Sequence, residues 1–362
     1  MTVVAIVGAA LGFMALIVLH ELGHFTAAKA VGMRVERFSL FFPPLLLRKK
    51  VGETEYALGA IPAGGYVKIS GMNPDEHLPD EVRTRAYYSQ PVWKRVTVIA
   101  AGPFVNFVLA FVLILVLFTA IGPETVSNHV GRIEAGYPAA TALKPGDRIL
   151  AVDGRRGGPE QLSKAISANR CAEQPPRPRC PARRPVTLLV ERGGRRIETT
   201  LRPIYDPIAR RTRLGFAYAR GPRQTLPFGR ALAITADRFT YITWETVKLP
   251  LRLFNAQQRK EITGIVGTYE ITRQTILDDA ASVVGILGVI SLGLAVINLF
   301  PFLPLDGGHI FWAIVEKVRR RPVPFSVMER AGVVGFMLVI ALFMIGFTND
   351  IGRLTGEGFQ VR

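Results

Sequence analysis

The sequence lacks the features of a cleaved secretory signal. No basic segment precedes the first apolar stretch, Val3–Leu19, and a His-Glu pair follows this stretch where the small residues of a cleavage site would lie. These two absences exclude a signal peptide. The stretch is therefore predicted to remain in the protein as a permanent membrane helix.

The sequence also lacks a nucleic-acid-binding motif, although the chain is strongly basic. Its 45 Lys and Arg residues outnumber 28 Asp and Glu residues and give a formal net charge of +17. The basic residues are spread over loops and do not form a patch interleaved with aromatic residues. Nucleic acid is therefore not an expected partner, and membrane orientation with a solvated outer surface explains the charge better.

Cysteine is scarce. The only two cysteines, Cys171 and Cys180, both lie in the Pro- and Arg-rich segment Arg170–Arg184. In an oxidising compartment the pair could form a disulfide. In a mobile loop they would remain two unpaired thiols, and the sequence leaves both outcomes open.

Long apolar stretches are abundant, and hydrophobic residues make up 49% of the chain. A soluble domain of this size does not need that share. Four stretches approach the roughly 20 residues with which a helix crosses a bilayer. They are Val3–Leu19, Val96–Ile121, Val283–Phe300 and Ala331–Phe347. The sequence thus predicts a polytopic α-helical membrane protein with about four transmembrane helices.

The loops beside these stretches predict their orientation, because Lys and Arg in short loops mark the cytoplasmic side. Basic residues gather after the first stretch and between the third and fourth: Arg34, Arg37, Arg48, Lys49, Lys50, Lys317, Arg319, Arg320 and Arg321. With four spans these two regions fall on one side of the membrane. We therefore expect a multi-pass membrane protein with both termini on the outer side.

A segment with strand character follows the first stretch on the cytoplasmic side. Residues Glu53–Ser70 flank the turn-forming residues Pro62, Gly64 and Gly65. This pattern predicts a small cytoplasmic-side β-hairpin or sheet. Its glycines are either part of an ordinary surface turn or candidates for substrate binding.

A soluble α+β domain is predicted on the outer side, from about Val126 to Pro203. We expect strands at Val130–Glu134, Arg148–Asp153, Val186–Glu191 and Arg196–Leu201 and a helix at Pro159–Ala168. Segments 136–140 and 143–154 resemble the core of a PDZ domain, which binds extended peptides at a sheet edge. No Gly-Leu-Gly-Phe-type carboxylate loop precedes them, so capture of a peptide C-terminus is not assigned.

Four parts of the chain follow from these observations. Residues 1–125 form a first membrane half, 126–203 the PDZ-like extracytoplasmic domain, 204–280 an extracytoplasmic membrane-associated helical segment, and 281–362 a second membrane half. Within the third part, Phe228–Leu253 places apolar, aromatic and basic residues at helical spacing. This helix would lie on the outer membrane face or pack on the PDZ-like domain.

The motif His20-Glu21-Leu22-Gly23-His24 lies where the first apolar stretch ends. Histidines four residues apart share one helical face and can bind one zinc ion, while Glu21 acts as a general base that takes a proton from water. Ionisable groups in a membrane helix cost roughly 2.5–3.5 kcal/mol each, which indicates function. The structural alternative is that neighbouring helices satisfy these polar groups.

A third ligand is expected from the other membrane half, because a catalytic zinc keeps three protein ligands and one open position. Two prolines interrupt the third stretch just before Asp306, and broken helices at this depth line cavities. Asp306 could instead cap the following helix, Ile310–Val318. His309 is the rival ligand. We favour Asp306 because a carboxylate offsets part of the zinc charge in a dry cavity, which leaves His309 to orient that carboxylate.

The two motifs together resemble the site-2 protease family of intramembrane zinc metalloproteases, and most closely its bacterial RseP-type branch. They read His-Glu-x-x-His and Asn-x-x-Pro-x-Pro-x-Leu-Asp-Gly and lie on separate predicted spans. Further similar segments are 64–68, 101–106 and 264–267. The resemblance implies Zn²⁺ as cofactor and the following site residues: zinc ligands His20, His24 and Asp306, base Glu21, and substrate contacts at Asn298, with Gly64 and Gly65 as further candidates.

The resemblance also implies a location in the bacterial inner (cytoplasmic) membrane with both termini in the periplasm. It further implies a reaction and a set of partners. The reaction is peptide-bond hydrolysis within transmembrane segments of single-span proteins, such as anti-sigma-factor-like proteins or remnant signal peptides. The lipid bilayer is the second partner. Peptides are also expected to contact the PDZ-like domain. Better-known members carry two PDZ domains, whereas this chain shows one. A membrane PDZ scaffold with a non-catalytic metal site is the alternative, against which the intact Glu21 argues. Zinc transport is disfavoured because few other ionisable residues lie in the spans.

Overall fold

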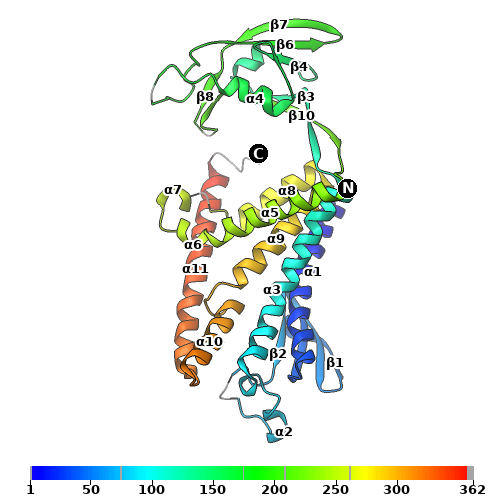
Figure 1. The fold of residues 1–362 in the computed structure, drawn as a ribbon, viewed down its shortest axis with the longest axis vertical. Helices are drawn as coiled ribbons and strands as arrows, with labels where there is room; N and C mark the ends of the chain where they lie inside the picture. Colours follow the sequence, from blue (N-terminus) through cyan, green and yellow to red (C-terminus); the bar gives the residue numbers. More distant parts are fainter. Residues whose placement is uncertain (1, 74–75, 174, 208, 261, 357–362) are drawn as a thin grey trace. The chain divides into compact units, whose positions relative to one another are not determined.

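The computed structural model describes residues 2–73, 76–173, 175–207, 209–260 and 262–356. Its contacts divide the chain into two compact units (Figure 1). Unit 1 comprises Met1–Ile121 and Leu226–Arg362, and unit 2 is Gly122–Thr225. The domain boundaries inferred from the sequence stay predictions.

Unit 1 is built on long apolar helices. They are α1 (Thr2–Ala30), α3 (Val92–Val116) with the π-helical turn η2 (Leu117–Ile121), α9 (Val283–Asn298), α10 (Asp306–Arg319) and α11 (Phe325–Thr355). Within the described residues, three helical segments are long and apolar enough to cross a membrane: Ala10–Ala30, Val92–Ile121 and Ser326–Thr355. The expected third span corresponds to α9, a shorter apolar helix of 16 residues.

Helix α3 packs against both α1 and α9. One apolar cluster joins Ala110 of α3 to Leu292 and Val296 of α9, with Phe239 and Ile242 packed against it. The last two residues belong to α5 (Phe228–Val247). The helix expected at 228–253 therefore buries one side against α3 and α9, and the short helices α6 (Leu249–Arg252) and α7 (Ala256–Arg259) follow it.

The sheet that was predicted for the cytoplasmic side is larger than expected. Strand β1 (Val35–Val51) pairs with β2 (Thr54–Ile69), and Leu40 faces both Gly65 and Leu58, so the first part of β1 lies between two parts of β2. The connecting turn lies at Gly52, which has a φ of +62°. The chain reverses direction between Leu58 and Gly65, where the turn was predicted, because 55–58 run in the same direction as 37–40 and 65–69 run in the opposite direction. Strand β1 was missed. Its paired prolines and basic run are typical of a loop, but its phenylalanines pack in the fold: Phe38 contacts Phe25 of α1.

The remaining elements of unit 1 connect these helices. They are α2 (Asp80–Arg83), η1 (Tyr87–Ser89), α8 (Ile265–Asp278) and η4 (Ala280–Ser282). The fully buried carboxylate of Asp350 in α11 accepts hydrogen bonds from the backbone N–H groups of Gly264 (3.1 Å) and Gly267 (2.7 Å). This contact fastens the N-terminus of α8 to α11, because free N–H groups at a helix start favour an anionic partner.

Unit 2 is an α+β domain with antiparallel strands and one longer helix. Its sheet has the strand order β10-β3-β4-β6-β7, with β5 paired to β4. The elements are β3 (Glu124–Ile133), η3 (Pro138–Thr141), β4 (Arg148–Val152), β5 (Arg155–Arg156), α4 (Pro159–Ser167), β6 (Val186–Arg192), β7 (Arg195–Leu201), β8 (Ile204–Asp206), β9 (Arg211–Arg213) and β10 (Phe216–Arg223).

The core of unit 2 lies between α4 and the sheet. Leu162 and Ile166 of α4 pack with Ile149 of β4 and Leu188 of β6. The four strands and the helix predicted here are confirmed to within a few residues, apart from the longer N-terminal extension of β3. Strands β8, β9 and β10 were not predicted: β8 and β9 have only three residues each, and β10 contains Gly221 and Pro222, which are typical of a turn.

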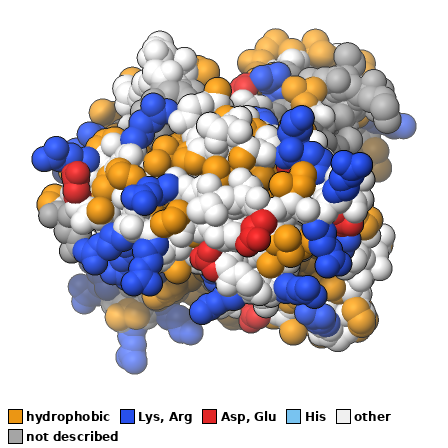
Figure 2. Space-filling view, turned by 90° about the horizontal axis from the view of Figure 1, so that it is seen from above, with side chains coloured by type: hydrophobic (Ala, Val, Ile, Leu, Met, Phe, Trp, Pro, Cys, Tyr) orange, Lys and Arg blue, Asp and Glu red, His pale blue; other side chains and the backbone are white. Residues whose placement is uncertain are grey.

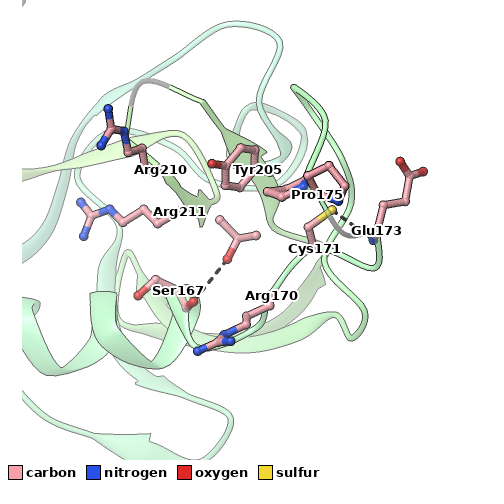
Figure 3. Close-up of a pocket in the computed structure, with 10 residues that line it drawn as sticks. Ser167, Arg170, Cys171, Glu173, Pro175, Tyr205, Arg210 and Arg211 are labelled. Atoms are coloured by element: carbon pink, nitrogen blue, oxygen red, sulfur yellow. Dashed lines mark hydrogen bonds between the residues drawn. The ribbon is translucent and has the colours of Figure 1, made fainter. Parts of the chain in front are cut away.

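The disulfide left open by the sequence is present between Cys171 and Cys180. The segment it closes is tied to β8, since the N–H of Tyr205 donates to the carbonyl of Cys180 at 2.8 Å. A cavity of about 460 Å³ lies beside it (Figure 3). Tyr205, Ser167 and three arginines line it: Arg170, Arg210 and Arg211.

Basic side chains are distributed widely on the face of the molecule that Figure 2 shows. Lys and Arg side chains form several groups there, separated by apolar and uncharged ones, and acidic side chains are fewer.

Candidate active site

Helix α1 carries three of the residues predicted for the site. It continues through the motif to Ala30, so His20 and His24 lie one turn apart on the same face. Both histidines are buried, with exposed fractions of 5% and 7%. Glu21 follows His20 directly and is half-buried.

Asp306 comes from the opposite half of the chain. Helix α9 ends at Asn298, the chain turns through 299–305, and α10 begins at Asp306 (Figure 1). The turn is so compact that a Cβ on Gly308 would lie only 2.5 Å from the backbone nitrogen of Leu303. Asp306 is the first residue of the helix, and Leu305 before it is the N-cap residue. The side chain of Asp306 faces the two histidines.

Three ligand-type atoms converge at this point. The Oδ2 atom of Asp306 lies 3.1 Å from Nε2 of His20 and 3.4 Å from Nε2 of His24, and the two Nε2 atoms lie 3.2 Å apart. Within the described residues, this is the group of His, Cys, Asp or Glu side chains that could hold a metal ion. The structure thus brings the three predicted ligands together.

The spacing of these atoms fits a tetrahedral zinc ion. Ligand atoms about 2.0–2.1 Å from a tetrahedral zinc lie about 3.3–3.4 Å from one another, close to the observed sides of 3.1, 3.2 and 3.4 Å. The donor set of two imidazoles and one carboxylate is also suited to zinc with an open fourth position. A cation among them would remove the repulsion between converging lone pairs.

Helix α3 supports both histidines, which the sequence analysis did not anticipate. The Nδ1 atom of His24 lies 2.9 Å from the carbonyl oxygen of Val98, and Nδ1 of His20 lies 3.3 Å from the carboxamide nitrogen of Asn106. Between these positions, a Cβ on Gly102 would lie 2.9 Å from Nε2 of His20. The signal was available, because Asn106 is a polar residue in an otherwise apolar stretch and such residues are costly in a membrane.

The same helix is fastened to α10 by an ion pair. The buried guanidinium of Arg95 donates to both carboxylate oxygens of Glu316, at 2.8 and 2.9 Å. A bidentate pair of this kind fixes orientation as well as distance. It holds the helix that begins with Asp306 against the helix that supports the histidines.

Strand β2 passes beside Glu21. A Cβ on Gly65 would lie 3.4 Å from Cγ of Glu21, and one on Gly64 would lie 3.8 Å from Cγ2 of Ile17. Residues 65–69 pair with β1 on one side only. The two glycines singled out in the sequence therefore lie next to the proposed base, on a strand with an open edge.

Two further predicted residues make no hydrogen bond through their side chains to any other described residue. Asn298 is the last residue of α9 and is half-buried. His309 is half-buried one turn after Asp306, and the expected hydrogen bond to that carboxylate is absent from the described part of the chain. The amide of Asn298 is thus free to bind a peptide backbone.

An ion-pair cluster outside the site anchors the sheet to α1. Arg85 and Lys29 both bind the carboxylate of Glu53, at 2.7–2.8 Å. These hydrogen bonds, that of Arg85 foremost, lower the pKa of Glu53 to about 2. The β1–β2 turn is thereby held at the end of the helix that carries the motif.

Comparison with known proteins gives one coherent result. The family model described as Peptidase family M50 matches residues 8–342. Similar proteins include one from Clostridium perfringens named a "putative zinc metalloprotease", 30% identical over 96% of this chain and 98% of its own length. The metalloprotease MmpA of Caulobacter vibrioides is 29% identical over 93% of this chain and 92% of its own length.

Proposed function

This chain belongs to peptidase family M50 and is a membrane-embedded zinc metalloprotease of the site-2 type, and from that premise we propose that it cleaves single-span membrane proteins within their transmembrane segments. The observation that carries the proposal is the position of Glu21. Glu21 follows His20 directly in α1, and a Cβ on Gly65 of β2 would lie 3.4 Å from its Cγ.

His20, His24 and Asp306 are the proposed zinc ligands. When bound, zinc supplies a Lewis acid that makes water more acidic and polarises a carbonyl group. Glu21 accepts the proton of the attacking water and delivers it to the departing amine. Of the three proposed ligands, Asp306 carries a negative charge. This charge offsets part of the zinc charge, which suits a site that excludes bulk water.

The substrate must enter this site in an extended form, because helical carbonyl groups are occupied by hydrogen bonds. We propose that an unwound substrate segment adds to the edge of β2 at residues 64–69, where only one side is paired. The glycines at 64 and 65 leave room for it beside Glu21. The free carboxamide of Asn298 binds the substrate backbone from the other membrane half.

The finer membrane arrangement belongs to the same proposal. We place α9 as a fourth, short span, both termini in the periplasm of a bacterial inner membrane, and unit 2 outside as a PDZ-like domain that contacts substrate peptides. About 1.5 Å per residue makes the 16 residues of α9 about 24 Å long. This is short of a typical 30 Å core, as expected of a helix that breaks at the catalytic loop. Anti-sigma-factor-like proteins and remnant signal peptides are the proposed substrates, in regulated intramembrane proteolysis.

Substitution Glu21→Gln tests the assignment. The purified full chain should retain zinc, because no proposed ligand changes, while cleavage of a single-span reporter should fall by about 10²–10⁴-fold. Metal analysis and product analysis by mass spectrometry measure the two quantities. Glu160→Gln, on the exposed surface of α4, is the matched control and should change neither. Undiminished cleavage by the Glu21→Gln protein would remove Glu21 from the mechanism.

A further inference from the structure

Two polar groups on α3 face the rings of His20 and His24 at the Nδ1 atoms, away from the triangle. The carbonyl oxygen of Val98 lies 2.9 Å from Nδ1 of His24, and the carboxamide of Asn106 lies 3.3 Å from Nδ1 of His20. A backbone carbonyl can only accept a hydrogen bond. His24 therefore carries its proton on Nδ1 and turns the lone pair of Nε2 towards the triangle.

His20 needs the same arrangement to bind a metal through Nε2, because a neutral imidazole carries one N–H and the metal takes the other nitrogen. Its Nδ1–H then requires an acceptor. In the structure the nearest group is the amide nitrogen of Asn106, which is itself a donor, at 3.3 Å. Two donors cannot form a hydrogen bond with each other.

The carboxamide of Asn106 contains the missing acceptor. Asn106 is fully buried, and its Oδ1 atom has no hydrogen-bond partner among the described residues. The oxygen and nitrogen of a carboxamide have nearly the same shape, so half a turn of the amide exchanges them within the same space. That turn places Oδ1 at Nδ1 of His20.

We propose that Asn106 is a positioning residue for zinc, which accepts the Nδ1–H of His20 through its carboxamide oxygen. The inference rests on the proposed role of His20 as a zinc ligand. Without metal, the orientation seen here suits the other tautomer, in which Nε2–H of His20 donates to Asp306, 3.1 Å away. The amide of Asn106 can donate to one tautomer of His20 and accept from the other. A Leu side chain can do neither, and a carboxylate can only accept from the metal-bound tautomer.

Zinc affinity of the full chain, measured by chelator competition in detergent, tests this role. Asn106→Leu keeps the size but removes the acceptor and should weaken zinc binding by about 10- to 100-fold. Asn106→Asp restores an acceptor and should bind zinc at least as tightly as the parent protein. Ser291→Ala is the matched control, because the Ser291 hydroxyl donates to the backbone carbonyl of Asn106 at 2.9 Å and contributes nothing to His20; its zinc affinity should match the parent.

A second measurement needs no variant. In the zinc-loaded protein labelled with ¹⁵N-histidine, NMR should find the proton of His20 on Nδ1, and on Nε2 after zinc removal. Parental zinc affinity in Asn106→Leu, equal weakening in Asn106→Asp and Asn106→Leu, or an unprotonated Nδ1 in the loaded protein would each overturn the inference. Failure of the parent protein to bind zinc would instead overturn the proposed function, so the two failures are distinguishable.

Discussion

Replacement of Gly102 by alanine probes how closely α3 approaches the metal site. A Cβ built at this position lies 2.9 Å from Nε2 of His20 and 2.5 Å from Cε1 of His24. An ordinary contact between such atoms is about 3.5–4.0 Å, so the rings or the helices must move. Without zinc the rings can turn away. With zinc bound they are held in place, and the strain appears as lost zinc affinity.

The expected size of the effect follows from the cost of overpacking. Inserting a methyl group into a well-packed site typically costs about 1–3 kcal/mol, which corresponds to about 5- to 150-fold in a binding constant. The usual effect of this exchange has the opposite sign, since alanine is favoured over glycine by about 1 kcal/mol inside a helix. Zinc affinity by chelator competition and cleavage of a single-span reporter should therefore both fall.

Gly293→Ala is the matched control, because this glycine lies in the apolar helix α9 and a Cβ there meets no atom within 4 Å. It should leave zinc binding unchanged and keep or raise thermal stability. A folded Gly102→Ala protein that binds zinc as tightly as Gly293→Ala would refute the close approach of α3 to the two histidines.

Two other predictions concern ligand identity and acid stability. Asp306→Asn should weaken zinc retention and abolish cleavage, while His309→Ala should keep measurable zinc with reduced activity; metal analysis showing the reverse would make His309 the ligand. In unit 2, the buried carboxylate of Asp147 accepts two hydrogen bonds from Arg192 at 2.7 Å, which lower its pKa. Because the folded pKa is the lower one, this stabilisation is present above about pH 4 and is lost as the pH falls towards the folded value. Asp147→Asn should lower the unfolding free energy of unit 2 by about 2–3 kcal/mol at pH 7, measured by calorimetry of the full chain, with a smaller difference from the parent at pH 3.

The proposed ligand set was predictable from the sequence because two simple rules determine it. Helical periodicity places His20 and His24 on one face, and the prolines before Asp306 predict a broken helix that lines a cavity. Neither rule gives a distance between segments 286 residues apart. The convergence of the three ligand atoms depends on how α9 ends and α10 begins, which only the packed structure provides.

The β sheet shows where sequence reasoning failed. Strand β1 contains two adjacent prolines and a run of basic residues, which locally predict a loop. Its pairing on both sides, with Gly65 and with Leu58 of β2, is a tertiary effect that supplies hydrogen bonds to an otherwise unfavourable strand. For the same reason the role of Gly65 beside Glu21 could not be derived from the turn propensity of glycine.

Helix α3 explains why substitutions outside the two recognised motifs should affect the site. Its residues Arg95, Val98, Gly102 and Asn106 are spaced three or four apart and therefore lie on one face. Arg95 binds Glu316 of α10, and the carbonyl of Val98 accepts from His24. Gly102 leaves room for both histidine rings, and Asn106 faces His20. The two histidines of α1 and the helix that carries Asp306 thus contact the same face of α3. A shift of α3 by a fraction of an ångström changes the distance between the histidines and Asp306, because all three are positioned from it. Catalytic geometry in this fold is accordingly a property of three helices, only two of which carry ligands.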